Sequence, residues 1–200
     1  LRALKENGWA LLMSPDTLHR CKGKLAPKWP DGSQAEYVLD NGAWGCHQRG
    51  ESFDEQAFLW AYERIASGAE WVVAPDIVAG GMSSLELTKK WLPILDHKKI
   101  LIAVQDGMKP KDVDDIITQN NGIFLGGSTE YKMNSMSMWG EYCLSKDIHF
   151  HVARVNTIRR LRACQAAGVD SIDGSSASRF SVNANILPSA AMQQSLFGKR

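Results

Sequence analysis

The chain of 200 residues lacks paired cysteines, a strong charge of either sign and a long apolar run. Its formal net charge is +1, which excludes a generally cationic nucleic-acid coat but leaves room for a local basic face. No stretch approaches the ~20 apolar residues that cross a bilayer, and no basic segment followed by an apolar one opens the chain. We therefore expect a cytoplasmic protein that is not exported and has no membrane partner.

The four cysteines are widely scattered, with no CxxC pair and no histidine at metal-ligand spacing beside them. We expect reduced thiols and neither a disulfide framework nor a zinc site. The cysteines are Cys21, Cys46, Cys143 and Cys164.

What the chain does contain is a regular alternation of short apolar runs and helical patterns, repeated every ~20 to 35 residues, the size of one β/α unit. The runs fall at residues 9–13, 37–39, 71–74, 100–104, 123–125, 150–155 and 169–172. This alternation predicts an α/β fold, specifically a single (β/α)8-type TIM barrel over residues 1–200. No convincing eighth strand follows Asp173, so we expect a barrel that is shortened or irregularly closed.

Local signals place several helices between these strands. Ser52 with Glu55 predicts a capping box for a helix to about Ser67, and Pro110 suits the first position of another. A Met-rich stretch over 133–144 and a segment over 157–167 are also predicted to be helical, and residues 182–197 could form a last helix. We find no interdomain linker and predict one domain.

Most of the strands end at a polar residue or a glycine pair. Loops after parallel barrel strands emerge on one face, so we expect these strand-terminal residues to converge. Leu39-Asp40-Asn41-Gly42-Ala43-Trp44 and Gly168-Val169-Asp170-Ser171-Ile172-Asp173 stand at the two ends of the series. Pro75-Asp76, Ala103-Val104-Gln105 and Leu125-Gly126-Gly127 stand between them, in that order.

This ordered set resembles the motifs of the guanine transglycosylases of queuosine and archaeosine synthesis, which are (β/α)8 barrels, over about residues 35 to 180. The resemblance implies that Asp173 is a nucleophile that attacks C1′ and expels guanine, forming a covalent glycosyl intermediate. It implies that Asp40 is the general acid and base for the leaving and entering bases, with a pKa nearer neutrality than that of a free carboxylate.

The same resemblance assigns the base pocket. Asp76 would accept hydrogen bonds from the guanine edge, while Gln105 and the backbone N–H of Gly127 would donate to O6, with Gly126 and Ser128 in the same turn. Trp44 would lie against one face of the base, with Val152 opposite.

Taken singly, these residues have simpler explanations. An Asp at a strand end is often the N-cap of the next helix, which for Asp76 alone is the favoured interpretation. Gly126-Gly127 alone is a turn and Gln105 alone a surface amide. His149 and His151 share one strand face and could ligate a metal, yet a structural role is favoured because no third ligand stands nearby.

The sequence departs from the tRNA enzymes because every cysteine precedes Asp173, so the CxCxxC cluster of their zinc site is missing. We expect no metal and no cofactor, and a closer resemblance to the phage-type enzymes that place 7-deazaguanines such as preQ0 into DNA, which would act in the host cytoplasm. DNA and the free base are the expected partners, with tRNA as the alternative polymer. Hydrolysis of an N-glycosidic bond stays open as a different reaction, and the oligomeric state is left open.

A DNA substrate would have to present a flipped or single-stranded guanosine. We expect phosphate contacts from a basic rim, with Arg154 and Arg179 near the nucleophile and Lys22, Lys24 and Lys28 further out.

Overall fold

The computed structural model describes residues 2–20 and 27–175, and in this part seven strands form one sheet in sequence order. Each strand pairs with the next in parallel, as β/α units require. The strands are β1 (Leu11–Met13), β2 (Tyr37–Leu39), β3 (Val72–Val73), β4 (Ile100–Val104), β5 (Asn121–Leu125), β6 (His149–Val152) and β7 (Ser171–Ile172). The prediction of an α/β fold is confirmed.

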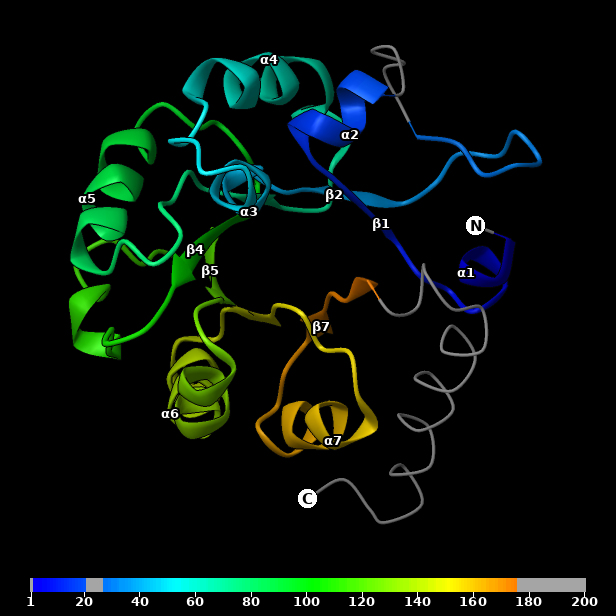
Figure 1. Cartoon of the computed structure of the whole chain (residues 1–200). Helices are drawn as coiled ribbons and strands as arrows, with labels where there is room; N and C mark the ends of the chain where they lie inside the picture. Colours follow the sequence, from blue (N-terminus) through cyan, green and yellow to red (C-terminus); the bar gives the residue numbers. More distant parts are fainter. Residues whose placement is uncertain (1, 21–26, 176–200) are drawn as a thin grey trace.

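The sheet curls, and its main helices lie on the outside of the curve (Figure 1). Its longest ladder joins β4 and β5, where five pairs run from Ile100 opposite Asn121 to Val104 opposite Leu125. Among the described residues, β1 and β7 are the two edges of the sheet and do not pair with each other, and no eighth strand lies between them. The structure is therefore an open, barrel-like sheet, and the closed eight-stranded form is not reached within the described residues.

A helix or 3-10 turn follows each of the strands β1 to β6, and one helix precedes β1. The helices are α1 (Arg2–Glu6), α2 (Pro15–Arg20), α3 (Ala43–Gln48), α4 (Glu55–Ile65), α5 (Met82–Trp91), α6 (Thr129–Lys146) and α7 (Ile158–Ala166), with 3-10 turns η1 (Ala66–Gly68) and η2 (Pro110–Asp112). No helix in the described segments is long and apolar enough to cross a membrane. The helix predicted over 182–197 lies outside the described residues.

One local prediction was wrong, and a second was confirmed only in part. Asp54, rather than Ser52, caps α4, because its carboxylate accepts a hydrogen bond from the backbone N–H of Ala57 at 2.9 Å. Pro110 does occupy a first helical position, but the element it opens is the short turn η2. A chain has several candidate caps near a helix start, and the tertiary path selects one of them.

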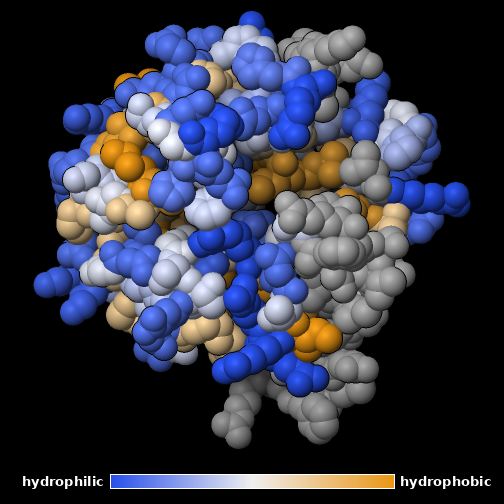
Figure 2. All heavy atoms as spheres, in the orientation of Figure 1, coloured by the Kyte–Doolittle hydropathy of each residue, from blue (hydrophilic) through white to orange (hydrophobic). Residues whose placement is uncertain are grey.

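Side chains alternate between the two faces of the sheet. Along β4, Ile100, Ile102 and Val104 enter the core beneath the helices, whereas Leu101 and Ala103 belong to a separate cluster inside the curl. That inner cluster also holds Val38, Trp71, Val73 and Phe124. Hydrophilic residues predominate on the face of the molecule in Figure 2, which is hollowed near its centre.

Candidate active site

The site is built from residues that directly follow the carboxyl ends of the strands. Asp40 follows β2, Gln105 follows β4, Gly126 follows β5 and Asp173 follows β7. In each case the last residue of the strand packs against the helices. Because successive side chains point to opposite faces of a sheet, the residue that follows points to the inside of the curled sheet. The parallel sheet thereby brings these positions to one edge.

Asp173 is fixed by hydrogen bonds to both carboxylate oxygens. The backbone N–H of Arg154 donates to Oδ1 at 2.9 Å, and Nε2 of His151 lies 3.1 Å from Oδ2. The side chain is 17% exposed. Burial alone would raise its pKa, but the hydrogen bond and charge of His151, the Arg154 N–H and the charge of Lys132 outweigh burial and hold the pKa below its usual value. Asp173 is therefore an ionised carboxylate with limited access to water.

Asp40 has the opposite electrostatics. Burial, together with the negative charges of Asp173 and Asp76, raises its pKa to about 7, against lowering hydrogen bonds from the backbone N–H groups of Gly42, at 3.1 Å, and Asn41. The repulsion between Asp40 and Asp173 indicates that the two carboxylates lie in one electrostatic environment. One carboxylate stays ionised while the other exchanges a proton near neutral pH, the pattern of paired catalytic carboxylates.

Asp76 is held by a buried asparagine. Nδ2 of Asn41 donates to Asp76 Oδ1 at 2.8 Å and to the carbonyl of Ala74 at 2.7 Å, and Oδ1 of Asn41 accepts from the Ala43 N–H at 2.9 Å. Burial raises the pKa of Asp76 to about 6 despite the bond from Asn41. Asn41 therefore couples the loop after β2 to the loop after β3, a role that the sequence motif does not reveal.

The interpretation of Asp76 as a helix cap was wrong. Helix α5 has Gly81 at its N-cap and no side-chain capping bond. Ser84 Oγ instead accepts from the N–H of Ile77 at 3.0 Å, which ties the loop to the helix. The carboxylate of Asp76 therefore does not cap α5.

Gln105 is buried, with 3% exposure, and is not a surface amide. Its Nε2 donates to the carbonyl of Ile77 at 2.9 Å, which fixes the amide across the loop after β3. An amide nitrogen carries two hydrogens, so this contact leaves a second donor on Gln105.

The glycine pair makes a tight turn before α6. Gly127 has a φ of 74°, and a Cβ at this position would lie 2.4 Å from Asp106 Oδ2. Asp106 accepts from both the backbone N–H and the hydroxyl of Ser128, at 2.7 and 2.6 Å. Ser128 is also the N-cap of α6, because its hydroxyl accepts a hydrogen bond from the Tyr131 N–H. The hydroxyl therefore stabilises the first turn of this helix.

Arg154 connects three loops of the site. Its guanidinium lies over the ring of Trp44, 4.5 Å from the centroid, and donates to the carbonyl of Gly127. Its backbone N–H binds Asp173, and its φ is 58°, a left-handed value that an arginine seldom adopts. The loops after β2, β5 and β7 are therefore drawn together around one residue, and the guanidinium lies inside the site rather than on an outer rim.

The predicted position of Val152 opposite Trp44 was wrong. Val152 is 1% exposed and belongs to the core between the sheet and the helices, because its place in β6 gives it the outward orientation. Trp44 itself is 42% exposed at the start of α3. One face of its ring is covered by the guanidinium of Arg154.

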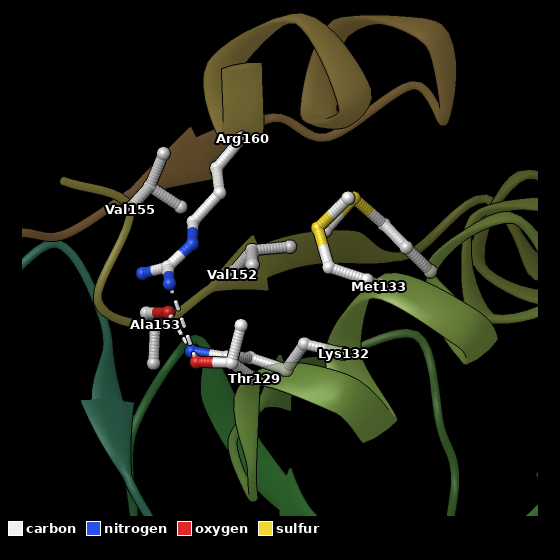
Figure 3. Close-up of a pocket in the computed structure, with 8 residues that line it drawn as sticks. Thr129, Lys132, Met133, Val152, Ala153, Val155 and Arg160 are labelled. Atoms are coloured by element: carbon white, nitrogen blue, oxygen red, sulfur yellow. Dashed lines mark hydrogen bonds between the residues drawn. The ribbon is translucent and has the colours of Figure 1, made fainter. Parts of the chain in front are cut away.

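Lys132 is a site residue that the sequence analysis missed. It is 3% exposed, and its ammonium donates to the carbonyl of Ala153, whose peptide group also supplies the N–H that binds Asp173 (Figure 3). Burial, together with the positive charge of Arg154, lowers its pKa to about 8, although the negative charge of Asp173 acts in the opposite direction. Lys132 shares the helical spacing of Met136, Trp139 and Cys143, all buried, and a lysine at a core position was the available signal.

Arg160 completes the basic group beside Lys132. It reaches from α7 towards α6, where its guanidinium lies 3.4 Å from Thr129 Oγ1, and it also contacts the carbonyl of Arg154 at 3.4 Å (Figure 3). The side chains of Lys132, Arg154 and Arg160 thus all contact carbonyl or hydroxyl oxygens.

Of the basic residues predicted further from the nucleophile, Lys28 lies within the described part of the chain. Lys28 is exposed in the connection between α2 and β2, where it pairs with Gln34 in an antiparallel bridge. Lys22, Lys24 and Arg179 lie outside the described residues. Within residues 2–20 and 27–175, no group of three or more His, Cys, Asp or Glu side chains is arranged to hold a metal ion.

No family model matches this chain, and no curated protein matches it.

Proposed function

We propose that this chain is a base-exchange glycosyltransferase that replaces guanine in DNA with a free 7-deazaguanine base, such as preQ0, through a covalent Asp173-glycosyl intermediate. The observation that carries the proposal is the pair of strand-terminal carboxylates with opposed proton affinities, an ionised Asp173 and an Asp40 whose pKa is about 7. A double displacement at C1′ needs one carboxylate to attack and another to carry a proton.

In the first displacement, a carboxylate oxygen of Asp173 forms a bond to C1′ as the C1′–N9 bond breaks. The electron pair of that bond leaves with guanine, and the protonated Asp40 supplies a proton to the departing base. The transition state has oxocarbenium character, which a neighbouring negative charge stabilises.

In the second displacement, Asp40 is a carboxylate and removes the proton from N9 of the incoming 7-deazaguanine. N9 then attacks C1′, and the C1′–O bond to Asp173 breaks, returning the electron pair to the carboxylate. Two inversions give overall retention of the β configuration. No group is oxidised or reduced, so the scheme needs no redox cofactor.

Base selection in this proposal comes from Asp76 and Gln105. With a pKa of about 6, Asp76 is mostly ionised at pH 7.5 and can accept from both N1–H and the exocyclic amine of a guanine-like base. The second hydrogen on Gln105 Nε2 and the backbone of Gly127 would serve O6. Asn41 holds the acceptor in place through its bond to Asp76.

A base can stack on the covered face of Trp44 only if it replaces the guanidinium of Arg154 there. A purine on the face now covered by Arg154 would have to displace the guanidinium, which is then available to a flanking phosphate. Arg154 therefore keeps its expected role as a phosphate contact, from a starting position within the site.

DNA is favoured over tRNA by the resemblance to the phage-type enzymes, and the test must include both polymers. The protein is incubated with labelled guanine or preQ0 and with single-stranded DNA, duplex DNA or tRNA, and the digested nucleosides are analysed by mass spectrometry. We expect incorporation into DNA. Incorporation into tRNA alone would change the polymer, and release of guanine without incorporation would identify a hydrolase. No reaction on any of these polymers would overturn the proposed activity.

A further inference from the structure

A row of hydrogen-bonded side chains extends from Asp173 into the interior of the curled sheet. Ser171 Oγ lies 2.8 Å from His151 Nδ1 and 2.7 Å from His149 Nε2, while His151 Nε2 lies 3.1 Å from Asp173 Oδ2. The four residues come alternately from β6 and the β7 segment. They meet because all four have the inward orientation on neighbouring strands.

The imidazole of His151 is held on two sides by aromatic rings. It stacks on Phe124 with centroids 4.8 Å apart and planes 16° apart, and its centroid lies 4.8 Å from that of Trp71. The residue is 1% exposed. The ring therefore has little freedom to turn away from the carboxylate.

The hydrogen positions follow from the chemistry of the two ends. An ionised carboxylate only accepts, so Nε2 of His151 must carry the hydrogen in its bond to Asp173. The Ser171 hydroxyl can donate one hydrogen and accept others, so it can bond to both imidazoles at once. At the far end, burial lowers the pKa of His149 to about 4, with the charge of Lys99 acting in the same direction. His149 is therefore neutral at pH 7.

We propose that His151 is a positioning residue for Asp173: its Nε2–H holds Oδ2 of the carboxylate, while Ser171 and His149 fix the orientation of the imidazole. The inference rests on the proposed function, in which Asp173 is the nucleophile. The second displacement returns negative charge to the Asp173 carboxylate as the C1′–O bond breaks. A fixed donor at Oδ2 stabilises that charge, so its removal should slow turnover.

The first test replaces His151 with Phe, which keeps an aromatic ring between Trp71 and Phe124, and with Gln, which restores a side-chain N–H. We expect His151→Phe to lower kcat for exchange roughly 10- to 100-fold, the effect of losing a hydrogen bond to a charged group, with little change in KM for the base. His151→Gln should recover part of the loss. His19→Phe is the matched control, because His19 stacks on Trp60 at 4.1 Å on the surface, and it should behave as the wild type.

A pH profile separates this role from simple damage to the fold. The charged or polar groups that face Asp173 are His151, the Arg154 N–H, Lys132 and Asp40, and only the first is lost in the variant. The pKa of Asp173 should therefore rise, and the acid limb of kcat should move to higher pH. A variant that is merely less well folded would lose activity without moving that limb.

The second test does not depend on turnover. In wild-type protein labelled with ¹⁵N-histidine and ¹³C-carboxyl aspartate, NMR should show a hydrogen on Nε2 of His151 and a carboxyl of Asp173 that titrates below its ordinary range, assigned with Asp173→Asn. In His151→Phe that titration should move upward.

The outcomes distinguish the two proposals. If the wild type exchanges no base but the NMR titrations behave as described, the proposed function fails and the structural role of His151 stands. If Nε2 of His151 carries no hydrogen, or if Asp173 titrates identically with and without His151, the positioning role is overturned. Equal pH profiles for His151→Phe and the wild type would overturn it as well.

Discussion

At the scale of single residues, the site depends on how strongly each carboxylate holds a proton. The same residue type has a depressed pKa at position 173 and a pKa of about 7 at position 40. Asp173 is bound by His151 and by the backbone N–H of Arg154, with the charge of Lys132 nearby, whereas Asp40 is bound only by backbone N–H groups, those of Gly42 and Asn41, and faces the negative charges of Asp173 and Asp76. Hydrogen-bond donors and nearby charges, rather than burial alone, separate the two carboxylates, since burial raises both.

Asp173→Asn should abolish base exchange and any covalent protein–nucleic acid adduct, because an amide oxygen is a poor nucleophile and cannot return as a carboxylate leaving group. The measurement is adduct formation on a denaturing gel, alongside the exchange assay and a thermal melt. Asp115→Asn, at an exposed ion pair with Lys89, is the matched control and should retain both activities. Turnover by the Asp173→Asn protein would remove this residue from the nucleophile role.

Asp40→Asn should lose activity yet gain stability at alkaline pH. The folded pKa of about 7 lies above the unfolded value near 3.8, so ionised Asp40 destabilises the fold, and this cost grows as the pH rises from about 4 to 7. Above pH 7 the substitution should raise the free energy of unfolding by roughly 2–4 kcal/mol, because Asn keeps an acceptor for Gly42 and carries no charge. The gain should disappear near pH 4.

Denaturant unfolding of the wild type and Asp40→Asn at pH 4, 6 and 8 measures this effect. Asp115→Asn again provides the control, with a change within ~0.5 kcal/mol at each pH. An equal stability difference at pH 4 and 8 would show that the charge of Asp40 carries no cost in the folded protein.

At the scale of elements, α6 links the site to the helical layer. Ser128 caps its start beside the glycine turn, Lys132 reaches the Ala153 carbonyl from its second turn, and Gly140 approaches the end of α7. A Cβ on Gly140 would lie 2.0 Å from the carbonyl oxygen of Ala167. The position of α6, and hence of Lys132, therefore depends on a close helix contact that tolerates no side chain.

Gly140→Ala should destabilise the protein by about 1–3 kcal/mol, although Ala is otherwise the better helix former by ~1 kcal/mol. The overlap is with backbone, which cannot rotate away as a flexible side chain could. Chemical denaturation measures the change, and Ser137→Ala, at an exposed position of the same helix, should alter stability by less than ~0.5 kcal/mol. A stabilised Gly140→Ala protein would mean that α6 and α7 are not in this close contact.

At the scale of the whole molecule, the curled parallel sheet is strongest in its middle. The ladder of β4 and β5 has five pairs and is covered by apolar residues on both faces, while β7 has two pairs with β6. Hydrogen exchange should therefore be slowest for amides of β4 and β5 and faster for those of β1 and β7. Mass spectrometry of exchanged peptides measures this order. Uniform protection across the seven strands would contradict it.

Much of this architecture could be predicted from the sequence because it depends on local patterns. The apolar runs at 37–39 and 100–104 form strands with the same bounds. A parallel strand is buried on both faces, so its sequence is a continuous apolar segment that can be recognised without the structure. The parallel order of the strands then placed Asp40, Gln105 and Asp173 at one edge. Their catalytic and binding roles stay predictions.

The tertiary structure decided what each of these residues touches. Val152 and His151 are neighbours in one strand, yet one faces the helices and the other meets Asp173, because a single step along a strand reverses the side-chain direction. Asn41 binding Asp76, Arg154 covering Trp44 and Lys132 binding Ala153 join residues from different loops and helices. Composition and local periodicity determine elements, whereas proton affinities and contacts depend on the distances between residues that the fold alone brings together.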